Sequence, residues 1–492
     1  MPANKVPKTG FAISEYHDTR EVYRRLAKLT AQPVRRLKKS ALEAYLRQYE
    51  EHCKKSKAMT EEAKQYIPGG VQHNLAFSYP FPLVFPRAEG AYLYDLDGNR
   101  YIDFLQGGGP TVLGSNPPVI REQVEELLRA TGPVTGLFHE YELKLAKFIA
   151  ERFPSVEMFR MLGSGTESCM AAIRLARVAT GKKQIVKMGG AYHGWSDQLS
   201  YGMRIPGTRG FLSHGIPYYI FYRTHEVYPN DIDALKRRLQ FNQLRGGTAA
   251  VLVEPVGPES GTRPVDKDYN AKVRELCDRY GALLVFDEVV TGFRLGMSGA
   301  QGYFGIKPDL TVFGKAVTGG YPSAGGLGGR RELMELLAGG IGGKAIKKKV
   351  HVGGTLAANP LSCAAGYFTL MEMERTNAPE VAGRAGDRLT KGLQALIDKY
   401  RLPYVAYNQG SICHLETTGV MLLDIKLTKI KSLLEEINLR TQLMQEIGAA
   451  YMAEGLITLA GSRMYTSAAC TNAIIDDALA RFERVFQNIE GV

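Results

Sequence analysis

The stretch LLVFDEVVTGFR, residues 283–294, contains the pattern that decides the fold. It opens with four apolar residues, which is typical of a strand covered on both faces in a parallel sheet. Asp287 and Glu288 follow directly. A carboxylate at the end of a buried strand is costly unless a partner compensates its charge. Because open α/β sheets bind ligands at the carboxyl ends of their strands, we expect Asp287 to face a ligand.

The flanking sequence repeats this pattern. AAVLVEP (249–255) and DLTVFGK (309–315) are short apolar runs of the same kind, and helical stretches such as 270–280 alternate with them. This alternation, from about residue 110 to 330, predicts an α/β fold with a mostly parallel sheet. After residue 360 the pattern changes to a helix over 361–375, polar loops, short strands and a last helix over 472–488.

We therefore predict four regions: a basic helical N-terminal arm, an N-terminal segment of a small domain, a large α/β domain and a C-terminal α+β small domain. They span residues 1–57, 58–110, 111–360 and 361–492. Within the second region, GAYLYDLDGNRYIDFL (90–105) predicts a hairpin that turns at Asp97-Gly98-Asn99.

The composition restricts the class of protein. The chain has 492 residues, of which 45% are hydrophobic and 23% charged, as is normal for a globular protein. No apolar run approaches the ~20 residues of a membrane helix, and the N-terminus does not resemble a signal or transit peptide. The six cysteines are scattered singly, without metal or redox spacing. We expect a cytoplasmic protein with free thiols and no metal.

The net charge of +12 is concentrated near the N-terminus. Residues 1–57 hold 14 Lys and Arg against 6 Asp and Glu, which is +8, and leave +4 for the rest. A basic arm could bind nucleic acid. It has no nucleic-acid motif, so we expect a solvated helical arm that packs on a partner subunit, and no nucleic-acid or membrane partner.

Four further motifs carry functional side chains. In MLGSGTES, Ser164 and Glu167 form a capping box, so the helix N-terminus at Ser164, Gly165 and Thr166 could bind a phosphate or be an ordinary cap. Lys315 stands between a strand end and a glycine-rich loop. A partly desolvated lysine there is a nucleophile for carbonyls, although a snorkelling lysine would look the same.

The other two motifs are GGAYHGWSD (189–197) and HVGGTLAANPLSCAAG (351–366). Tyr192 could stack on a flat ring, with His193 beside it, or simply cover the core. Thr355 is a second phosphate contact or part of a tight turn. A phosphate cradle, a stacking aromatic, an acid and a lysine together suit pyridoxal 5′-phosphate (PLP). The lysine forms a Schiff base and Asp287 keeps the pyridine nitrogen protonated.

In this order and spacing, SGTES, YHG, VFDEVVTGFR, FGK and GGTLAANPLSCAAG resemble the class III aminotransferases. YIPGGV, GAYLYDLDGNRYIDFL and PSVEMFRMLGSGTES are most similar to glutamate-1-semialdehyde 2,1-aminomutases, and PFPL and ALLVFDEV to β-amino-acid aminotransferases. The resemblance implies fold type I and a homodimer, alone or paired into a tetramer, with active sites at the subunit interface.

The resemblance also implies roles for single residues. Lys315 holds the cofactor and moves a proton, and Asp287 binds the pyridine nitrogen. Val289 packs behind the ring, and Tyr192 stacks in front with His193 beside it. The phosphate is bound by Ser164, Gly165 and Thr166, with Thr355 reaching in from the partner subunit.

The substrate side departs from the aminomutases. PGGVQHNLAF has Ala76 near the place of their carboxylate-binding arginine, and LAGSRMYTSAAC has Gly461 and Ser462 in place of a glutamate. The latter brings in Arg463, a carboxylate anchor or else an ordinary salt-bridge residue. With the glycine-rich LQGGG (105–109), this makes His73, Gly108 and Arg463 the candidate substrate residues.

We therefore expect an aminotransferase that moves an amino group from an α- or β-amino acid or an amine to an oxo-acid by a ping-pong mechanism. The alternatives are an intramolecular aminomutase like those acting on glutamate 1-semialdehyde, and an amino-acid racemase or epimerase.

Overall fold

The structure is a computed structural model that describes residues 9–132, 134–210, 214–338, 349–423, 430–459 and 461–492. The chain forms two compact units. The first contains residues 119–377 together with the start of the chain up to Phe11. The second contains residues 12–118 and 378–492, so both of its parts flank the first unit in sequence.

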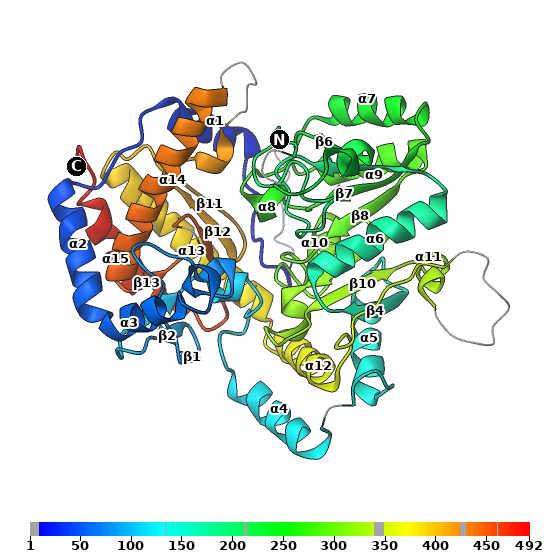
Figure 1. Cartoon of the computed structure of the whole chain (residues 1–492), viewed down its shortest axis with the longest axis horizontal. Coiled ribbons are helices and arrows are strands. Elements are labelled where there is room, and N and C mark those ends of the chain that lie inside the picture. The colour runs from blue at the N-terminus through cyan, green and yellow to red at the C-terminus, as the bar shows by residue number, and fades with distance from the viewer. Residues whose placement is uncertain (1–8, 133, 211–213, 339–348, 424–429, 460) are drawn as a thin grey trace. The chain divides into compact units, whose positions relative to one another are not determined.

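The first unit is built on a seven-stranded sheet with the order β4-β10-β9-β8-β7-β5-β6 (Figure 1). Its strands are β4 Met158–Leu162, β5 Gln184–Met188, β6 Thr224–Val227, β7 Thr248–Val253, β8 Leu283–Asp287, β9 Leu310–Gly314 and β10 Gly325–Gly329. From β9 to β6, neighbouring strands are parallel, whereas β10 runs antiparallel to both β9 and β4. This confirms the predicted α/β class and the mostly parallel sheet.

Helices cover both faces of this sheet, and the alternation of side chains along each strand decides which helix each residue meets. In β7, Ala250 and Leu252 pack with α6, while Val251 and Val253 pack with α7 and α9. The helices associated with this unit are α4 Pro118–Ala130, α5 Glu140–Arg152, α6 Gly165–Thr180, α7 Ile232–Gln243, α8 Pro258–Gly261, α9 Tyr269–Tyr280, α10 Gly299–Phe304, α11 Arg331–Met334 and α12 Pro360–Arg375.

The same alternation places the charged strand residues. In β8, Val285 belongs to the cluster with α6 and Leu284 to the cluster with α9. Asp287 is therefore on the α6 face of the sheet. In β5, Ile185 is on the α6 face as well, and Lys187, two residues on, shares that face.

The second unit combines two small sheets with helices. The four-stranded sheet has the order β1-β2-β3-β13, and the three-stranded sheet has the order β11-β12-β14. Its strands are β1 Arg87–Glu89, β2 Tyr92–Tyr94, β3 Arg100–Asp103, β11 Val405–Gln409, β12 Ile412–Glu416, β13 Leu456–Ile457 and β14 Arg463–Tyr465. β2 and β3 pair antiparallel, with Tyr94 opposite Arg100, which confirms the predicted hairpin.

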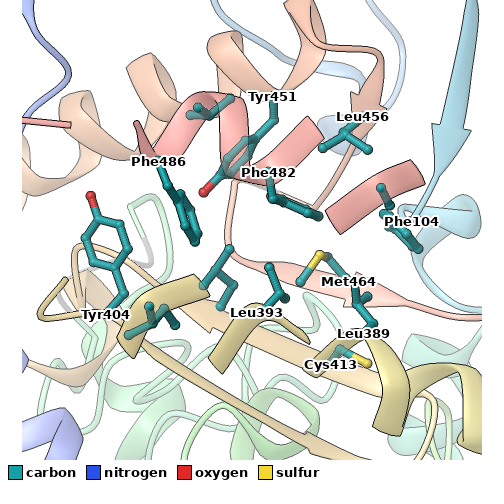
Figure 2. Packing of buried hydrophobic residues seen from close by; sticks show 14 of the residues in the cluster. Phe104, Leu389, Leu393, Tyr404, Cys413, Tyr451, Leu456, Met464, Phe482 and Phe486 are labelled. Carbon is teal, nitrogen blue, oxygen red and sulfur yellow. The ribbon is translucent and has the colours of Figure 1, made fainter. Parts of the chain in front are cut away.

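An extensive apolar core fills the second unit. Phe104, Leu393 and Tyr451 come from separate segments and converge in one cluster with Phe482 and Phe486, which lie one turn apart on α15 (Figure 2). The helices here are α1 Thr19–Ala31, α2 Lys39–His52, α3 Lys54–Ala63, α13 Ala378–Lys399, α14 Ile430–Ala453 and α15 Asn472–Phe486.

The basic N-terminal region forms helices, as predicted, and packs within its own chain. α1 buries Val22, Leu26 and Leu29, and α2 buries Tyr45 and Tyr49. Four of these five, all except Tyr49, belong to the apolar core of the second unit, so the apolar face of α1 is occupied there. Across the described residues, no helix is both long and apolar enough to cross a membrane.

Candidate active site

Most of the predicted cofactor residues lie at the carboxyl ends of strands in the seven-stranded sheet. Asp287 ends β8, Lys315 follows β9, and the segment carrying Tyr192 and His193 follows β5. Ser164 follows β4, which points the same way as β9 because β10 between them is reversed. Parallel strands therefore bring these residues to a common carboxyl-end edge.

Asp287 is almost fully buried, with 5% of its surface exposed, and it is held by three donors. Its Oδ2 accepts hydrogen bonds from His193 Nδ1 at 2.7 Å and from Cys169 Sγ at 3.5 Å. Its Oδ1 accepts the Val289 N–H at 3.0 Å. Burial lowers the pKa of His193, against the effect of Asp287. A neutral His193 that donates from Nδ1 leaves Nε2 as an acceptor, and this buried atom has no hydrogen-bond partner among the described residues.

Glu288, the second acid in the 283–294 stretch, binds backbone and side-chain donors that hold the local fold. Its carboxylate accepts the N–H groups of Ala300 and Gln301 at 2.7 and 3.0 Å, and the Thr291 hydroxyl at 2.9 Å. It thus holds the first turn of α10. The two neighbouring carboxylates thus have different environments: Asp287 lies on the α6 face of the sheet, whereas Glu288 binds the first turn of α10.

The start of α6 has the predicted cap. Ser164 Oγ accepts the Glu167 N–H at 3.2 Å, and the Glu167 carboxylate accepts the Gly163 N–H at 2.8 Å. The return bond of the capping box therefore goes to Gly163. The first N–H groups of an α-helix have no partner within the helix, so the α6 N-terminus suits an anion.

Tight packing joins these elements around Val289. A Cβ on Gly165 would lie 2.9 Å from Val289 Cγ2, and one on Gly314 would lie 2.8 Å from Val289 Cγ1. Val289 is thus enclosed between the start of α6 and the residue before Lys315. In the same way, a Cβ on Gly194 would lie 2.2 Å from Thr166 Oγ1. The DEV motif therefore lies against both the SGT and the FGK motifs, and the YHG motif lies against SGT.

Lys315 has a strained backbone. Its φ is +46°, in the left-handed region that is uncommon for residues other than glycine, and it opens the 3₁₀ turn Lys315–Thr318. Such backbone is maintained only where its surroundings fix it, and it gathers at functional sites. The side chain is half-buried.

Thr355 is exposed in the loop before α12. A Cβ on its neighbour Gly354 would make ordinary contact, at 3.5 Å, with the Glu167 carboxylate of the same chain. The expected contact of Thr355 with a partner subunit's phosphate stays a prediction.

A family comparison decides the identity. The model described as Aminotransferase class-III matches residues 76–485, most of the chain. The chain belongs to the class III aminotransferases. It is an enzyme of this class, and the class uses PLP.

Relatives of known name agree with this assignment. The chain is 37% identical over 445 residues to a glutamate-1-semialdehyde 2,1-aminomutase 2 of Shouchella clausii, covering 87% of this chain and 97% of that protein. Among solved structures it is similar to a β-phenylalanine aminotransferase from Variovorax paradoxus, with a TM-score of 0.76, 28% identity and coverage of 90% and 96%. An ω-transaminase from Sphaerobacter thermophilus also has a TM-score of 0.76, with 27% identity and coverage of 88% and 97%. The fold is thus that of the type I PLP enzymes.

The class III site fits PLP. Asp287 supplies a buried carboxylate oriented by His193 and Cys169, and the α6 N-terminus offers N–H groups for a phosphate. Cys169, His193 and Asp287 would also suit a metal ion by distance alone, because their ligand atoms lie within 4.8 Å of one another. A metal needs a thiolate, whereas burial raises the pKa of Cys169 well above its usual value. The protonated thiol favours the hydrogen-bonded arrangement around Asp287.

All three candidate substrate segments contribute to the lining of a cavity of about 680 Å³ in the second unit, although His73 is the only one of the three candidate residues that lines it. His73 lines it, together with Ala76, Gly107 (the neighbour of Gly108) and Gly461. Arg463 is half-buried on β14, with its Cα opposite that of His414 on β12. None of the described residues lining the cavity is Lys, Arg, Asp or Glu, and most are apolar.

Three buried residues of the first unit, Cys169, Lys187 and Glu254, were not predicted from the sequence. Cys169 and Lys187 lie within a helix and a strand that look like ordinary core segments, so only the fold shows which groups they face. Glu254 had a visible signal, because it ends the apolar run AAVLVEP as Asp287 ends its own run. It is buried and accepts the Tyr192 N–H at 2.9 Å.

Proposed function

We propose that this enzyme moves an amino group from an α- or β-amino acid or an amine to an oxo-acid in a ping-pong cycle. The deaminated donor would leave before the acceptor binds. The observation that carries the proposal is the pairing of a buried, oriented carboxylate, Asp287, with a lysine at the end of the adjacent strand, Lys315. The PLP ring needs a carboxylate at its pyridine nitrogen and an amine at its aldehyde carbon, and these two groups lie at the ends of neighbouring strands.

The residues would share the work as follows. When bound, PLP supplies a ring that accepts electrons from the substrate Cα. Lys315 would hold the cofactor and move the proton at the substrate Cα. Asp287 would keep a proton on the ring nitrogen, Val289 and Tyr192 would pack on the two faces, and Ser164, Gly165 and Thr166 would bind the phosphate.

The substrate contacts are proposed for His73, Gly108 and Arg463. In support, the three segments that carry them together line one mostly apolar cavity in the second unit, and Arg463 offers a guanidinium for a carboxylate. We further propose a homodimer in which Thr355 completes the partner's phosphate site.

An intramolecular aminomutase is the second candidate, because the relatives at 36–42% identity bear that name. Against it, the cavity is lined by Ala76 and Gly461, small residues in the two segments where the resemblance places the aminomutases' arginine and glutamate. This difference leads us to prefer the aminotransferase.

The test is a set of single-substrate reactions with the PLP-loaded enzyme and α-amino acids, β-amino acids, ω-amines or glutamate 1-semialdehyde. A stoichiometric oxo product, with conversion of the cofactor to pyridoxamine phosphate, would support the aminotransferase and name its donor class. Multiple turnovers of the semialdehyde to 5-aminolevulinate without a second substrate would establish the mutase instead. A change in optical rotation without an oxo product would establish a racemase or epimerase.

A further inference from the structure

A buried lysine with no part in the proposed chemistry lies behind the Tyr192 segment. Lys187 in β5 has 1% of its surface exposed. Its ammonium group donates three hydrogen bonds, to the carbonyl oxygens of Ala191, Leu199 and Tyr201 at 2.9, 3.1 and 2.8 Å. All three ammonium protons are therefore used on the loop that follows its own strand.

A buried acid that directly follows β7, Glu254, binds the same loop. Glu254 accepts the Tyr192 N–H at 2.9 Å, and also the Glu259 N–H at 2.9 Å and the Ser260 N–H and hydroxyl. The Ala191 carbonyl and the Tyr192 N–H belong to one peptide bond. Because these two groups point in opposite directions in a trans peptide, Lys187 and Glu254 bind this peptide from its two sides.

Burying two opposite charges is costly unless each is well paired. Lys187 also has Glu226 as its direct neighbour on β6, and the Glu226 carboxylate accepts the Gly207 N–H at 3.0 Å. The charges around Lys187 are thus Glu226, Glu254 and Asp287, and each of them is engaged elsewhere by hydrogen bonds. These hydrogen bonds hold the backbone at Ala191 and Tyr192, and they therefore fix the positions of the Tyr192 and His193 side chains.

We propose that Lys187 and Glu254 are positioning residues that clamp the Ala191–Tyr192 peptide. The clamp holds Tyr192 where it can cover the cofactor ring and His193 where its Nδ1 donates to Asp287. A simple apolar strand residue in place of Lys187 would leave the buried carbonyls of Ala191 and Leu199 and the partly buried one of Tyr201 without this donor, and the loop would lose its fixed position.

The main experiment compares full-length Lys187→Met and Glu254→Gln with the wild type. We expect either change to raise the Kd for PLP by about ten-fold or more, the scale of a lost hydrogen bond to a charged group. Hydrogen exchange without added PLP should accelerate at residues 189–201 and stay unchanged in β11 of the second unit. Because both residues act on one peptide, the double variant should lose less than the product of the two single effects.

The matched control is Lys182→Met. Lys182 also donates to backbone carbonyls, those of Tyr280 and Gly281 at the C-terminal end of α9, and it precedes β5, whereas the clamp follows β5. It should leave the Kd and the exchange of residues 189–201 unchanged.

An unchanged Kd and unchanged exchange in Lys187→Met would overturn the proposal, as would fully multiplicative effects in the double variant. If a variant fails to fold, hydrogen exchange of the wild-type chain without PLP still tests the clamp. Slow exchange of the Tyr192 N–H would support the clamp, and exchange at the rate of an open loop would refute it.

Discussion

The carboxyl-end edge of the seven-stranded sheet in the first unit and the core of the second unit are buried to a similar degree. The first is rich in ionisable side chains, whereas the second consists mainly of apolar ones. The edge gathers ionisable groups: Asp287, His193, Cys169, Lys187 and Glu254 all have 5% or less of their surface exposed. The core around Phe482 and Leu393 is almost wholly apolar (Figure 2). Apolar burial stabilises the fold at little specific cost, whereas each buried charge needs a partner.

The two regions should therefore respond differently to substitution. At this edge, Asp287, Lys187 and Glu254 are each held by named donors or acceptors, and these bonds converge on the segments that would bind PLP. Changes there should alter chemistry more than stability, and changes in the core should do the reverse.

The largest expected effect is on Lys315. Lys315→Ala should abolish amino transfer, because the proton at the substrate Cα loses its carrier, while thermal stability changes little. Half-reaction rates and a melting curve measure the two quantities. Lys307→Ala, at an exposed lysine just before β9, is the control and should keep the full rate. Normal transfer by Lys315→Ala would refute the proposed chemistry.

The neighbouring acids offer the sharpest contrast. Asp287→Asn should slow proton removal by about 10²–10⁴-fold, since a neutral amide does not hold the ring nitrogen protonated. Glu288→Gln should keep the rate and lower the free energy of unfolding by about 1–3 kcal/mol, because it weakens the bonds to the start of α10. Single-turnover kinetics and urea unfolding separate the two. Equal losses of rate would remove the distinction between the acids.

In the apolar core, Phe482→Ala should lower the free energy of unfolding of the second unit by about 3–5 kcal/mol through the cavity it leaves. Phe482 is fully buried and packs edge-on against Tyr451, with ring centroids 4.9 Å apart. The rate per folded molecule at a permissive temperature should not change. A kinetic defect without loss of stability would contradict the division between edge and core.

Glu254 should make stability depend on pH. Burial raises its pKa to about 7, above an ordinary value near 4.3 in the unfolded chain. Between these values the folded state binds more protons than the unfolded state, so its stability falls as pH rises. From pH 5 to 7, the wild type should lose about 1–3 kcal/mol relative to Glu254→Gln in urea unfolding. A constant difference across that range would show that Glu254 is already ionised at pH 5.

The smallest effect is expected at Arg463. Arg463→Ala should raise KM for donors with a carboxylate by about ten-fold, the scale of one charge-assisted contact, and leave KM for plain amines unchanged. Steady-state kinetics with matched amino-acid and amine donors measure this. Equal changes for both donors would exclude Arg463 from carboxylate binding.

The strands β7, β8 and β9 could be predicted from sequence because both of their faces are buried, which leaves continuous apolar runs. The residues around Asp287 and Lys315 could be predicted because each motif keeps its chemistry in a short stretch. Lys187 and Cys169 could not, because their importance depends on which sheet face they share with Asp287, and a strand or helix pattern carries no such information. The separate direction of Glu288 depends in the same way on the position of α10.

The central claim is that Lys315, beside the buried Asp287, is the lysine that holds PLP. The most direct measurement is to load the purified enzyme with PLP, reduce it with borohydride, digest it and locate the modified lysine by mass spectrometry. We expect a phosphopyridoxyl group on Lys315 at one per chain, and none on Lys187. Stoichiometric labelling of any other lysine, with Lys315 unmodified, would contradict it.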